Sequence, residues 1–205
     1  MGLLCEKSQE NQNIESIKIN SVSINDIPQL KEIFISCWGK NGLYKDSTFK
    51  AMIGQKLSYA YKSKRKVLAF CLMCYNLDKK DNNTDKNIVE VALLCVREGY
   101  RHQKLGSTLL SFCINNCKKY NFQKIILHVS STNLPAFSLY KKLGFIVESF
   151  HEKYYHDENP KDNDAYLMTK NIWKLFYLLN KIFLIFYNIL FINTFFLKYN
   201  KQKLK

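Results

Sequence analysis

Residues 88–110 read "IVEVALLCVREGYRHQKLGSTLL", and the organisation of the chain is clearest here. The first nine residues, 88–96, are almost all apolar, which favours a buried central strand. A basic turn follows, and apolar residues recur at helical spacing from Leu105. A helix entered from a buried strand directs unpaired backbone N–H groups outward, where they suit a pyrophosphate, and Gly106 permits close approach. By itself, the pattern also fits the start of an ordinary helix.

The segments on both sides of this stretch alternate between strand and helix patterns. We expect further strands at 16–23, 58–63, 66–77, 124–130, 145–155 and 164–172, and helices at 25–38, 47–57 and 134–143. Residues 78–87 contain no apolar side chain and are expected to form a long loop. The order predicts an α/β fold, a mixed twisted β-sheet of about seven strands with helices on both faces.

Composition and charge limit the classes of protein to which the chain can belong. A length of 205 residues suits one domain with a terminal appendage. The net charge of +14 includes six lysines within 173–205, and the remaining charge is dispersed without an arginine–aromatic pattern. Nucleic acid is therefore not an expected partner.

Cysteine usage indicates a reducing compartment. The chain begins "MGLLCEKSQENQN", which is not a secretory signal, so its seven cysteines are expected to be free thiols. Cys71 with Cys74 and Cys113 with Cys117 have no accompanying histidine cluster. Packing roles are favoured over a metal site, and no metal is expected.

Three segments together resemble the GNAT acetyltransferase superfamily. "YRHQKLGSTLL" (100–110) is similar to its acetyl-CoA loop, Q/R-x-x-G-x-G/A, with Arg101 first and Gly106 last. "LHVSSTNLPAFSLYKKLGF" (127–145) matches the second signature, with Asn133, Ala136, Tyr140, Lys142, Gly144 and Phe145 in register. Residues 152–172 resemble the end of protein N-terminal acetyltransferases, where a Tyr-Tyr pair precedes an Asp-Ala-Tyr/His strand. The resemblance covers about residues 17–172 and is to catalytic subunits of the NatE and NatF type.

Lys104 departs from the pattern because it occupies the first glycine position. If that position needs a positive φ, lysine costs on the order of 1–2 kcal/mol. If φ is negative, the ammonium group points outward and can help to bind phosphates. The backbone N–H donors survive in both cases, so we expect a modified cradle that still binds; the alternative is a degenerate module.

The resemblance implies a GNAT fold that splays between its fourth and fifth strands and uses acetyl-CoA as cosubstrate. The cofactor-binding residues that it implies are Leu94, Cys95, Val96, Arg101, His102, Gln103, Lys104, Leu105, Gly106, Ser107, Asn133, Ala136, Tyr140 and Lys142.

Three residues are candidates for catalysis. Glu90 lies eleven residues before Arg101, where histone-type relatives carry a general base, although it also fits a solvent-facing strand start. His128 matches the NatE/NatF "LHV" pattern, whose histidine holds a water for amine deprotonation; a core histidine is the alternative. Tyr140 resembles the superfamily's general acid, or it is a core aromatic.

The substrate side rests on weaker signals. The expected acceptor-binding residues are Trp38, Tyr44, Ala92, Tyr154 and Tyr155. They suit a Met-apolar protein N-terminus, acetylated by direct transfer with a water-mediated general base. The alternatives are a lysine or small-amine N-acetyltransferase and a degenerate subunit of an acetyltransferase complex.

The tail from 173 to 205 follows a flexible N-terminus (1–16) and the acetyltransferase domain (17–172). Residues 175–197 are mostly apolar, and Lys174, Lys181 and Asn188 recur every seven residues, as in a helix lying in a membrane surface. We expect a hydrophobic helical tail that binds a membrane through 173–198. A helix packed on the domain is the alternative. The domain would then sit on the cytosolic face of an internal membrane, with auxiliary subunits as further partners.

Overall fold

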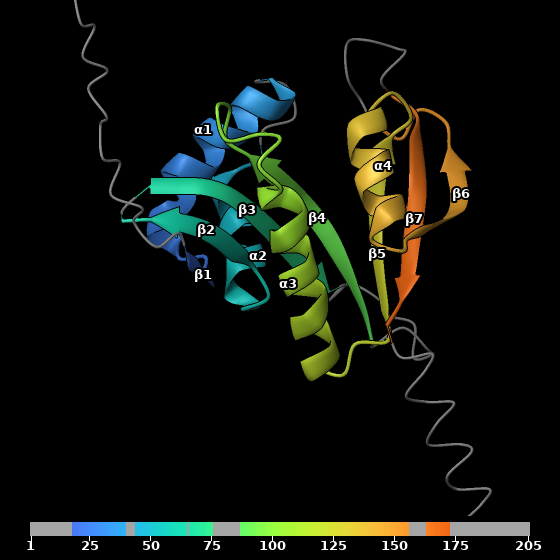
Figure 1. The fold of residues 1–205 in the computed structure, drawn as a ribbon, viewed down its shortest axis with the longest axis horizontal. Helices are drawn as coiled ribbons and strands as arrows, with labels where there is room; N and C mark the ends of the chain where they lie inside the picture. The colour runs from blue at the N-terminus through green and yellow to red at the C-terminus, as the bar shows by residue number, and fades with distance from the viewer. Residues whose placement is uncertain (1–17, 40–43, 65, 76–86, 156–162, 173–205) are drawn as a thin grey trace, which may run out of the picture.

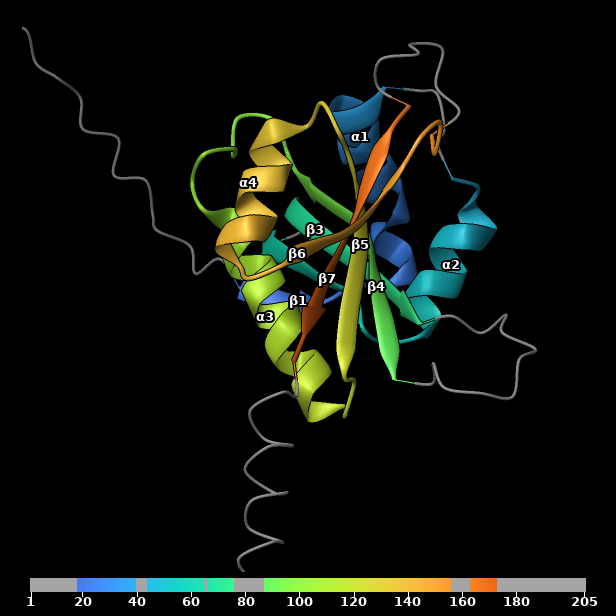
Figure 2. The same cartoon turned by 90° about the vertical axis from the view of Figure 1, so that its right-hand side faces the viewer.

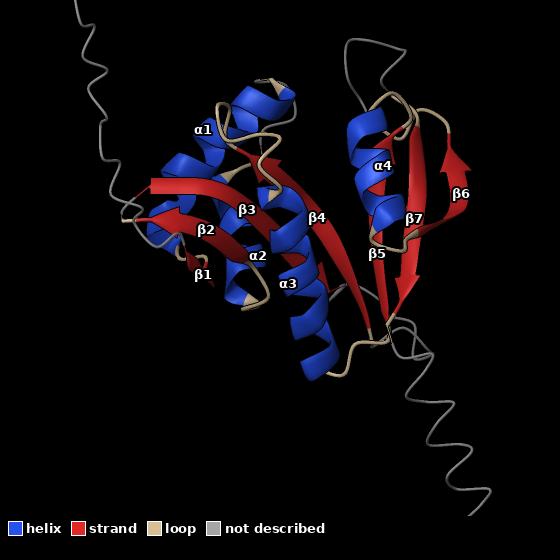
Figure 3. Cartoon of the chain, in the orientation of Figure 1, coloured by secondary structure: helices blue, strands red, loops and turns tan. Residues whose placement is uncertain are grey.

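The computed structural model describes residues 18–39, 44–64, 66–75, 87–155 and 163–172. The expectations for 1–16 and 173–205 lie outside these residues, so the domain boundaries remain predictions. Figures 1 and 3 show the described part as a twisted sheet flanked by helices.

Seven strands form one sheet, in the order β1-β2-β3-β4-β5-β7-β6. The strands are β1 (Lys18–Ser21), β2 (Tyr59–Ser63), β3 (Lys66–Tyr75), β4 (Ile88–Val96), β5 (Lys124–Ser130), β6 (Ile146–His151) and β7 (Ala165–Asn171). All neighbouring pairs are antiparallel except β4 with β5. The mixed sheet expected from the sequence is confirmed.

Helices cover both faces of the sheet. They are the short 3-10 helix η1 (Ile24–Asp26), α1 (Ile27–Trp38), α2 (Asp46–Gly54), α3 (Leu105–Lys119) and α4 (Leu134–Lys142). Figures 1 and 2 place α1 and α2 on one face and α3 and α4 on the other. Each face has its own buried cluster, centred on Phe49 and Phe70 beside α1 and α2 and on Leu109 and Leu127 beside α3.

The expected helix over 47–57 ends earlier, at Gly54. The Gln55 side chain bonds the Tyr75 backbone through both its amide atoms, and Lys56 has a left-handed φ of 60°. These features turn the chain so that Leu57 enters the core instead of continuing the helix.

β4 and β5 pair only at the start of each strand. The register joins Ile88 to Lys124, Val89 to Ile125 and Glu90 to Ile126. Beyond Glu90 the two strands diverge, as Figure 1 shows. The expected splay is confirmed, and it leaves the edge of β4 from Val91 onward open on the side facing β5.

A β-bulge at Ala92 changes which face β4 presents to each core. Leu72 of β3 lies opposite Leu93, and the next residue, Met73, lies opposite Val91, so Ala92 is an extra residue. Val91 therefore packs in the cluster beside α3, whereas Leu93 packs in the cluster beside α1 and α2. The bulge lies one residue after the strands begin to separate.

Candidate active site

A cavity of about 460 Å³ lies between the diverging strands. Its lining residues come from both faces of the sheet and are Phe34, Cys37, Trp38, Tyr44, Val91, Ala92, Leu93, Leu94, His128, Val129, Ser130, Thr132, Asn133, Ala136, Tyr140 and Tyr155. Because α1 lies on one face and α4 on the other, two ligands can enter from opposite sides and meet between the strands. Seven of the sixteen lining residues lie on β4 and β5, and the other nine come from α1, α4 and the segments next to them.

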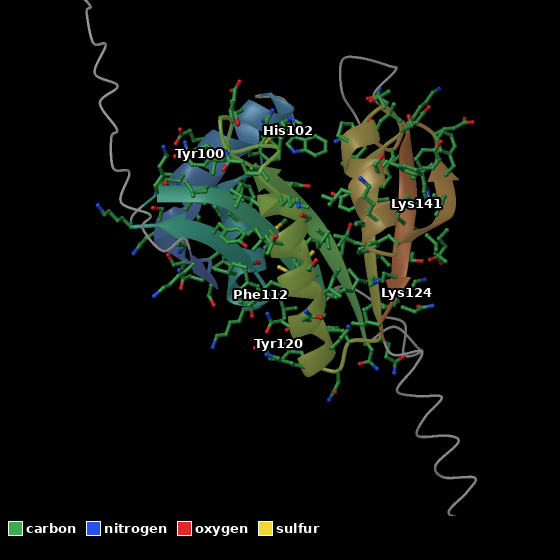
Figure 4. All side chains as sticks on the ribbon, in the orientation of Figure 1. Tyr100, His102, Phe112, Tyr120, Lys124 and Lys141 are labelled. Atoms are coloured by element: carbon green, nitrogen blue, oxygen red, sulfur yellow. The ribbon has the colours of Figure 1, made fainter. Side chains whose placement is uncertain are left out.

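In the turn between β4 and α3, Lys104 has the positive φ that is strained for a residue other than glycine. Lys104 caps α3 with φ 61° and ψ 6°, so the lysine occupies a left-handed conformation that favours glycine. Its carbonyl accepts hydrogen bonds from Ser107 Oγ at 2.8 Å and from Thr108 Oγ1 and N, each at 3.0 Å. These bonds hold the cap despite the strain. His102, labelled in Figure 4 near the start of α3, also has a φ of 61°.

Several side chains of this turn bond to the protein instead of facing outward. Arg101 Nη2 donates to Ser36 O at 3.2 Å and to Cys37 Sγ at 3.4 Å, and its Nε donates to Val96 O at 3.3 Å. Gln103 Nε2 donates to Gly99 O at 3.2 Å. The first backbone amides of α3 and the exposed side chains of His102 and Lys104 remain for an anion.

Gly106 and Leu105 shape the first turn of α3. A methyl group added at Gly106 would lie 3.4 Å from Val96 Cγ2, at the short end of ordinary contact. Leu105 is partly buried against the core cluster beside α3 and anchors the first turn. Together with the open edge of β4, the turn fits a pyrophosphate joined to an extended amide-bearing arm.

Not all of the residues expected from the second signature lie at the cavity. Asn133 lines the cavity and caps the helix, with Oδ1 accepting from Ala136 N at 3.2 Å, so its Nδ2 group can donate to a ligand. Ala136 and Tyr140 line the cavity, and Tyr140 is 8% exposed. Lys142 lies on the last turn, about 13 Å along the helix from Asn133, and the structure does not bring it to the cavity.

Burial determines the protonation of Tyr140. Removal from water raises the pKa of its phenol well above the usual value, so the hydroxyl stays protonated at neutral pH. Gly144, with φ 83°, ends α4 beyond Leu143, and the next residue, Phe145, packs edge-on against Tyr140 with ring centroids 5.9 Å apart. The helix end thereby fixes the tyrosine ring beside the cavity.

Glu90 and His128 contact each other directly. Glu90 Oε1 lies 3.2 Å from His128 Nδ1 across the gap between β4 and β5. His128 lines the cavity, and its ring stacks on Tyr154, with centroids 4.1 Å apart and planes 14° apart. Because a carboxylate only accepts hydrogen bonds, Nδ1 carries the proton in this pair and Nε2 is left available to a ligand.

Aromatic side chains form the wall on the side of α1. Trp38 stacks on Phe34 at 6.4 Å between centroids and contacts the Tyr155 ring at 6.3 Å. Tyr44 also contacts Phe34, at 6.1 Å. Tyr154 packs edge-on against Tyr155 at 4.9 Å and lies behind His128 instead of lining the cavity.

The carboxyl-terminal half of β4 supplies fewer lining side chains than expected. Leu94 lines the cavity, but Cys95 is 2% exposed and packs toward α1. The Val96 carbonyl is occupied by Arg101. Both residues can therefore act on a ligand only through the remaining backbone groups of the open edge.

Sequence reasoning missed part of the lining. The additional residues are Phe34, Cys37, Val91, Leu93, Val129, Ser130 and Thr132. Phe34 and Cys37 share one face of α1 with Trp38 at helical spacing, so this spacing could have predicted that both lie beside Trp38 in the site. The β4 and β5 residues carry no such signal, because their exposure depends on the separation of the strands.

Three of the four cysteines expected to pack are fully buried, and Cys74 is half-buried against the cluster beside α1 and α2. Cys71, Cys113 and Cys117 are buried in the cluster beside α3, and burial raises the pKa of the Cys117 thiol to about 12. Within the described residues, no three His, Cys, Asp or Glu side chains gather as metal ligands. No helix in the same part of the chain is long and apolar enough to cross a membrane.

Comparisons with known proteins agree with this geometry. Residues 27–145 match the family described as Acetyltransferase (GNAT) family. N-alpha-acetyltransferase 50 of Danio rerio is 27% identical over 159 residues, which cover 76% of this chain and 89% of that protein. An N-alpha-acetyltransferase of Sulfurisphaera tokodaii is 39% identical over 84 residues, 40% of this chain and 46% of its own length.

A solved structure shows the same fold. Arabidopsis thaliana Naa50 in complex with the bisubstrate analogue CoA-Ac-MVNAL has a TM-score of 0.63 and 25% identity to this chain, and the match covers 76% of this chain and 99% of the other. The matched family segment contains the β4–α3 turn and all of α4. The chain belongs to the acetyltransferase (GNAT) family, and it is an N-acetyltransferase whose acetyl donor is acetyl-CoA.

Proposed function

We propose that this acetyltransferase modifies the α-amine of protein N-termini that begin with methionine followed by an apolar residue. The observation that carries the proposal is the Glu90–His128 pair, whose histidine lines the cavity together with an aromatic wall. The relatives named as N-alpha-acetyltransferases support the same acceptor class.

His128 is the proposed general base. An amine must lose its proton before it can attack a thioester, and Nε2 of His128 is the ring atom left to accept that proton, directly or through water. Glu90 holds the Nδ1 proton and so selects the tautomer, and stacking on Tyr154 fixes the ring plane. Glu90 therefore acts as a positioning residue for His128.

Tyr140 is the proposed general acid. Acetyl-CoA supplies the acetyl thioester when bound, and the departing sulfur needs a proton. Tyr140 lines the cavity, and its hydroxyl stays protonated because burial raises its pKa. The N-terminus of α3, Lys104 and the Asn133 amide are the groups proposed to hold the cofactor.

The aromatic wall is proposed to select the acceptor. The cavity-lining side chains include no Asp, Glu, Lys or Arg among the described residues, so an apolar first side chain would meet complementary surface. The peptide part of the analogue bound to Arabidopsis Naa50 begins with Met-Val, which agrees with this preference.

The test is acetylation of matched peptides by the full chain with acetyl-CoA. A peptide beginning Met-Leu should have a kcat/KM at least about tenfold above one beginning Ser-Glu, a difference of about 1.4 kcal/mol in transition-state binding. The control is the Met-Leu peptide with a blocked N-terminus and an internal lysine, which should remain unmodified. Preferential acetylation of the internal lysine would refute the proposal.

We also propose that residues 173–198 hold the catalytic domain on the cytosolic face of a membrane. Support comes from sequence alone: mostly apolar residues at 175–197 are followed by lysines that suit anionic head groups. Asn180, Lys181 and Asn188 oppose full insertion, so the segment is proposed to lie on the membrane.

A further inference from the structure

Apolar side chains of the edge strand β6 remain exposed beside α4. β6 lies beyond β7 in the sheet, and its residues Val147 and Phe150 are 39% and 47% exposed. The two residues are three positions apart, but a register shift makes Glu148 an extra residue, so both side chains lie on one face. Their partners on β7 are Met168 and Tyr166, which pack in or against the cluster beside α3. The same face of the sheet therefore continues past the cover of the helices.

α4 adds to this surface through one stripe of side chains. Leu134, Phe137 and Lys141 are three and then four positions apart, so they share one face of the helix. The Phe137 ring lies 5.3 Å from the Tyr166 ring, which lies 5.2 Å from the Phe150 ring, so this stripe faces β6. Leu134 is 66% exposed. We call the resulting surface the α4–β6 strip; its residues are Leu134, Phe137, Val147, Phe150 and Tyr166.

Lysines border the strip at the end of α4. Lys141, labelled in Figure 4, and Lys142 are exposed on the last turn of the helix. Lys170 lies two residues after Met168 on the same face of β7, and its Nζ donates to Leu143 O at 2.6 Å. This border is therefore positively charged.

The acid of β6 lies on the other face of the sheet. Glu148 Oε2 pairs with Lys124 Nζ at 2.7 Å. Lys124 is opposite Asn171 in the register with β7, and Asn171 alternates with Lys170. The Glu148 carboxylate is thus engaged on the face opposite the strip, and it does not neutralise the lysines that border it.

The end of β7 connects this surface to the tail. The backbone N of Ile172 donates to Gln123 O at 2.9 Å, directly before the tail begins. Residues 173–205 contain six lysines and no acid. Because the border of the strip is also positive, it repels this tail, and it equally repels the same surface of a second copy. An anionic membrane complements both segments: its head groups attract the lysines, and its acyl boundary accepts apolar side chains.

We propose that the α4–β6 strip is a second membrane contact, which lays the catalytic domain against an anionic bilayer surface. This inference rests on the proposed membrane association of residues 173–198. The strip lies on the α4 side of the sheet, whereas the aromatic wall of the cavity lies beside α1. The docked domain therefore keeps the acceptor wall on the side away from the lipid, where protein N-termini can reach it.

The first experiment maps lipid contact with a photo-cross-linker in the full chain. p-Benzoylphenylalanine replaces either Phe150 or the control Phe112, which is 37% exposed on α3 and contacts Tyr59 in the other half of the sheet. The chains are irradiated on vesicles of phosphatidylcholine with one third phosphatidylserine. Lipid adducts at position 150 should exceed those at position 112 at least about fivefold.

The outcomes of this experiment separate the two membrane proposals. Equal adducts at both positions in vesicle-bound protein would overturn the second contact while leaving the tail as an anchor. A full chain that does not bind the vesicles would refute the proposed membrane association, and the strip contact with it. Cross-linking of position 150 to a protein instead of lipid, in membranes of cells that express the chain, would assign the strip to a protein partner and overturn the proposal.

The second experiment measures the affinity of full-chain variants for the same vesicles. Lys141→Glu should weaken binding about tenfold, because it exchanges one attraction for a repulsion. Lys50→Glu, at an exposed lysine of α2 on the other face, changes the net charge equally and should have less than about a twofold effect. Equal effects of these two variants would contradict the proposal.

The apolar part of the contact has its own pair of variants. Phe150→Ser should weaken binding about fivefold, whereas Ile24→Ser, at a 56% exposed residue of η1, should leave it unchanged. Equal affinities of the two variants would contradict insertion of the strip. The photo-cross-linking arm keeps an aromatic side chain at position 150, so it remains decisive if Phe150→Ser does not fold.

Discussion

Glu90 Oε1 and His128 Nδ1 lie 3.2 Å apart, at the point where β4 and β5 cease to pair. Glu90 is opposite Ile126 in the last pair of the parallel register, and His128 lies two residues beyond Ile126 on the same face of β5. The strands are still close enough here for side chains to meet, yet the backbone beyond is open. The point where the strands separate therefore places the His128 imidazole in the cavity lining, in contact with the Glu90 carboxylate.

Removing the imidazole should abolish general-base catalysis without removing its packing. In His128→Phe, the new ring can still stack on Tyr154, so the fold is retained. We expect kcat to fall about 100-fold or more and its rise with pH to flatten, as for loss of a general base. The affinity for acetyl-CoA should change little. Steady-state kinetics from pH 6 to 9, with calorimetry for the cofactor, measure both.

Glu90→Gln should have a smaller effect than His128→Phe. The amide oxygen can still accept from Nδ1–H, so the tautomer is kept while the charge is lost. We expect kcat to fall about tenfold. Full activity in Glu90→Gln, alongside a loss in His128→Phe, would show that the histidine acts without its carboxylate.

The left-handed conformation of Lys104 predicts a stabilising substitution. Lys104→Gly should relieve strain on the order of 1 kcal/mol and raise the melting temperature by about 2–4 °C. Lys104→Ala is the matched control, because it removes the same charge but keeps a Cβ at φ 61°. Thermal unfolding of both variants separates backbone strain from charge; equal melting temperatures would contradict the assignment of strain. Acetyl-CoA should bind Lys104→Glu more weakly than Lys104→Gly.

Burial of Tyr140 predicts a loss of stability in alkali. Its folded pKa lies above the unfolded value of about 10, so the folded state binds this proton more tightly. The resulting stabilisation is complete below about pH 10 and is lost as pH rises toward the folded pKa. Melting temperatures between pH 8 and 11 should fall less steeply in Tyr140→Phe than in the wild type. Tyr120→Phe, at the exposed tyrosine that directly follows α3 and is labelled in Figure 4, is the control.

Deleting residues 173–205 should release the catalytic domain from membranes while preserving turnover. Each apolar side chain that becomes fully buried contributes roughly 1.5–3 kcal/mol, and each lysine near an anionic surface adds about 1 kcal/mol. Fractionation of cells that express the full and shortened chains measures the effect, and carbonate extraction should release a segment that lies on the membrane. Recovery of the full chain in the soluble fraction would favour a tail packed on the domain.

Local sequence was sufficient for the order of the elements and for the ends of several of them. A nearly continuous apolar run marks β4, and an apolar period of 3.6 residues marks α3. Asn133 caps the start of α4, and Gly144 ends it with a positive φ. These signals act over a few residues, so they can be recognised without knowing the fold. The two signature segments identified the family for the same reason.

The contacts that define the site depend on tertiary packing. Glu90 meets His128 only because a parallel register, joined through α3, sets Glu90 opposite Ile126. Leu93 and Cys95 pack beside α1 only because one extra residue at Ala92 shifts the alternation of β4. The sign of φ at Lys104 likewise follows from joining β4 to α3, which the identity of the side chain does not reveal. Strand register, bulges and turn conformations depend on interaction energies summed over distant segments. They therefore cannot be predicted from the local hydrophobic pattern.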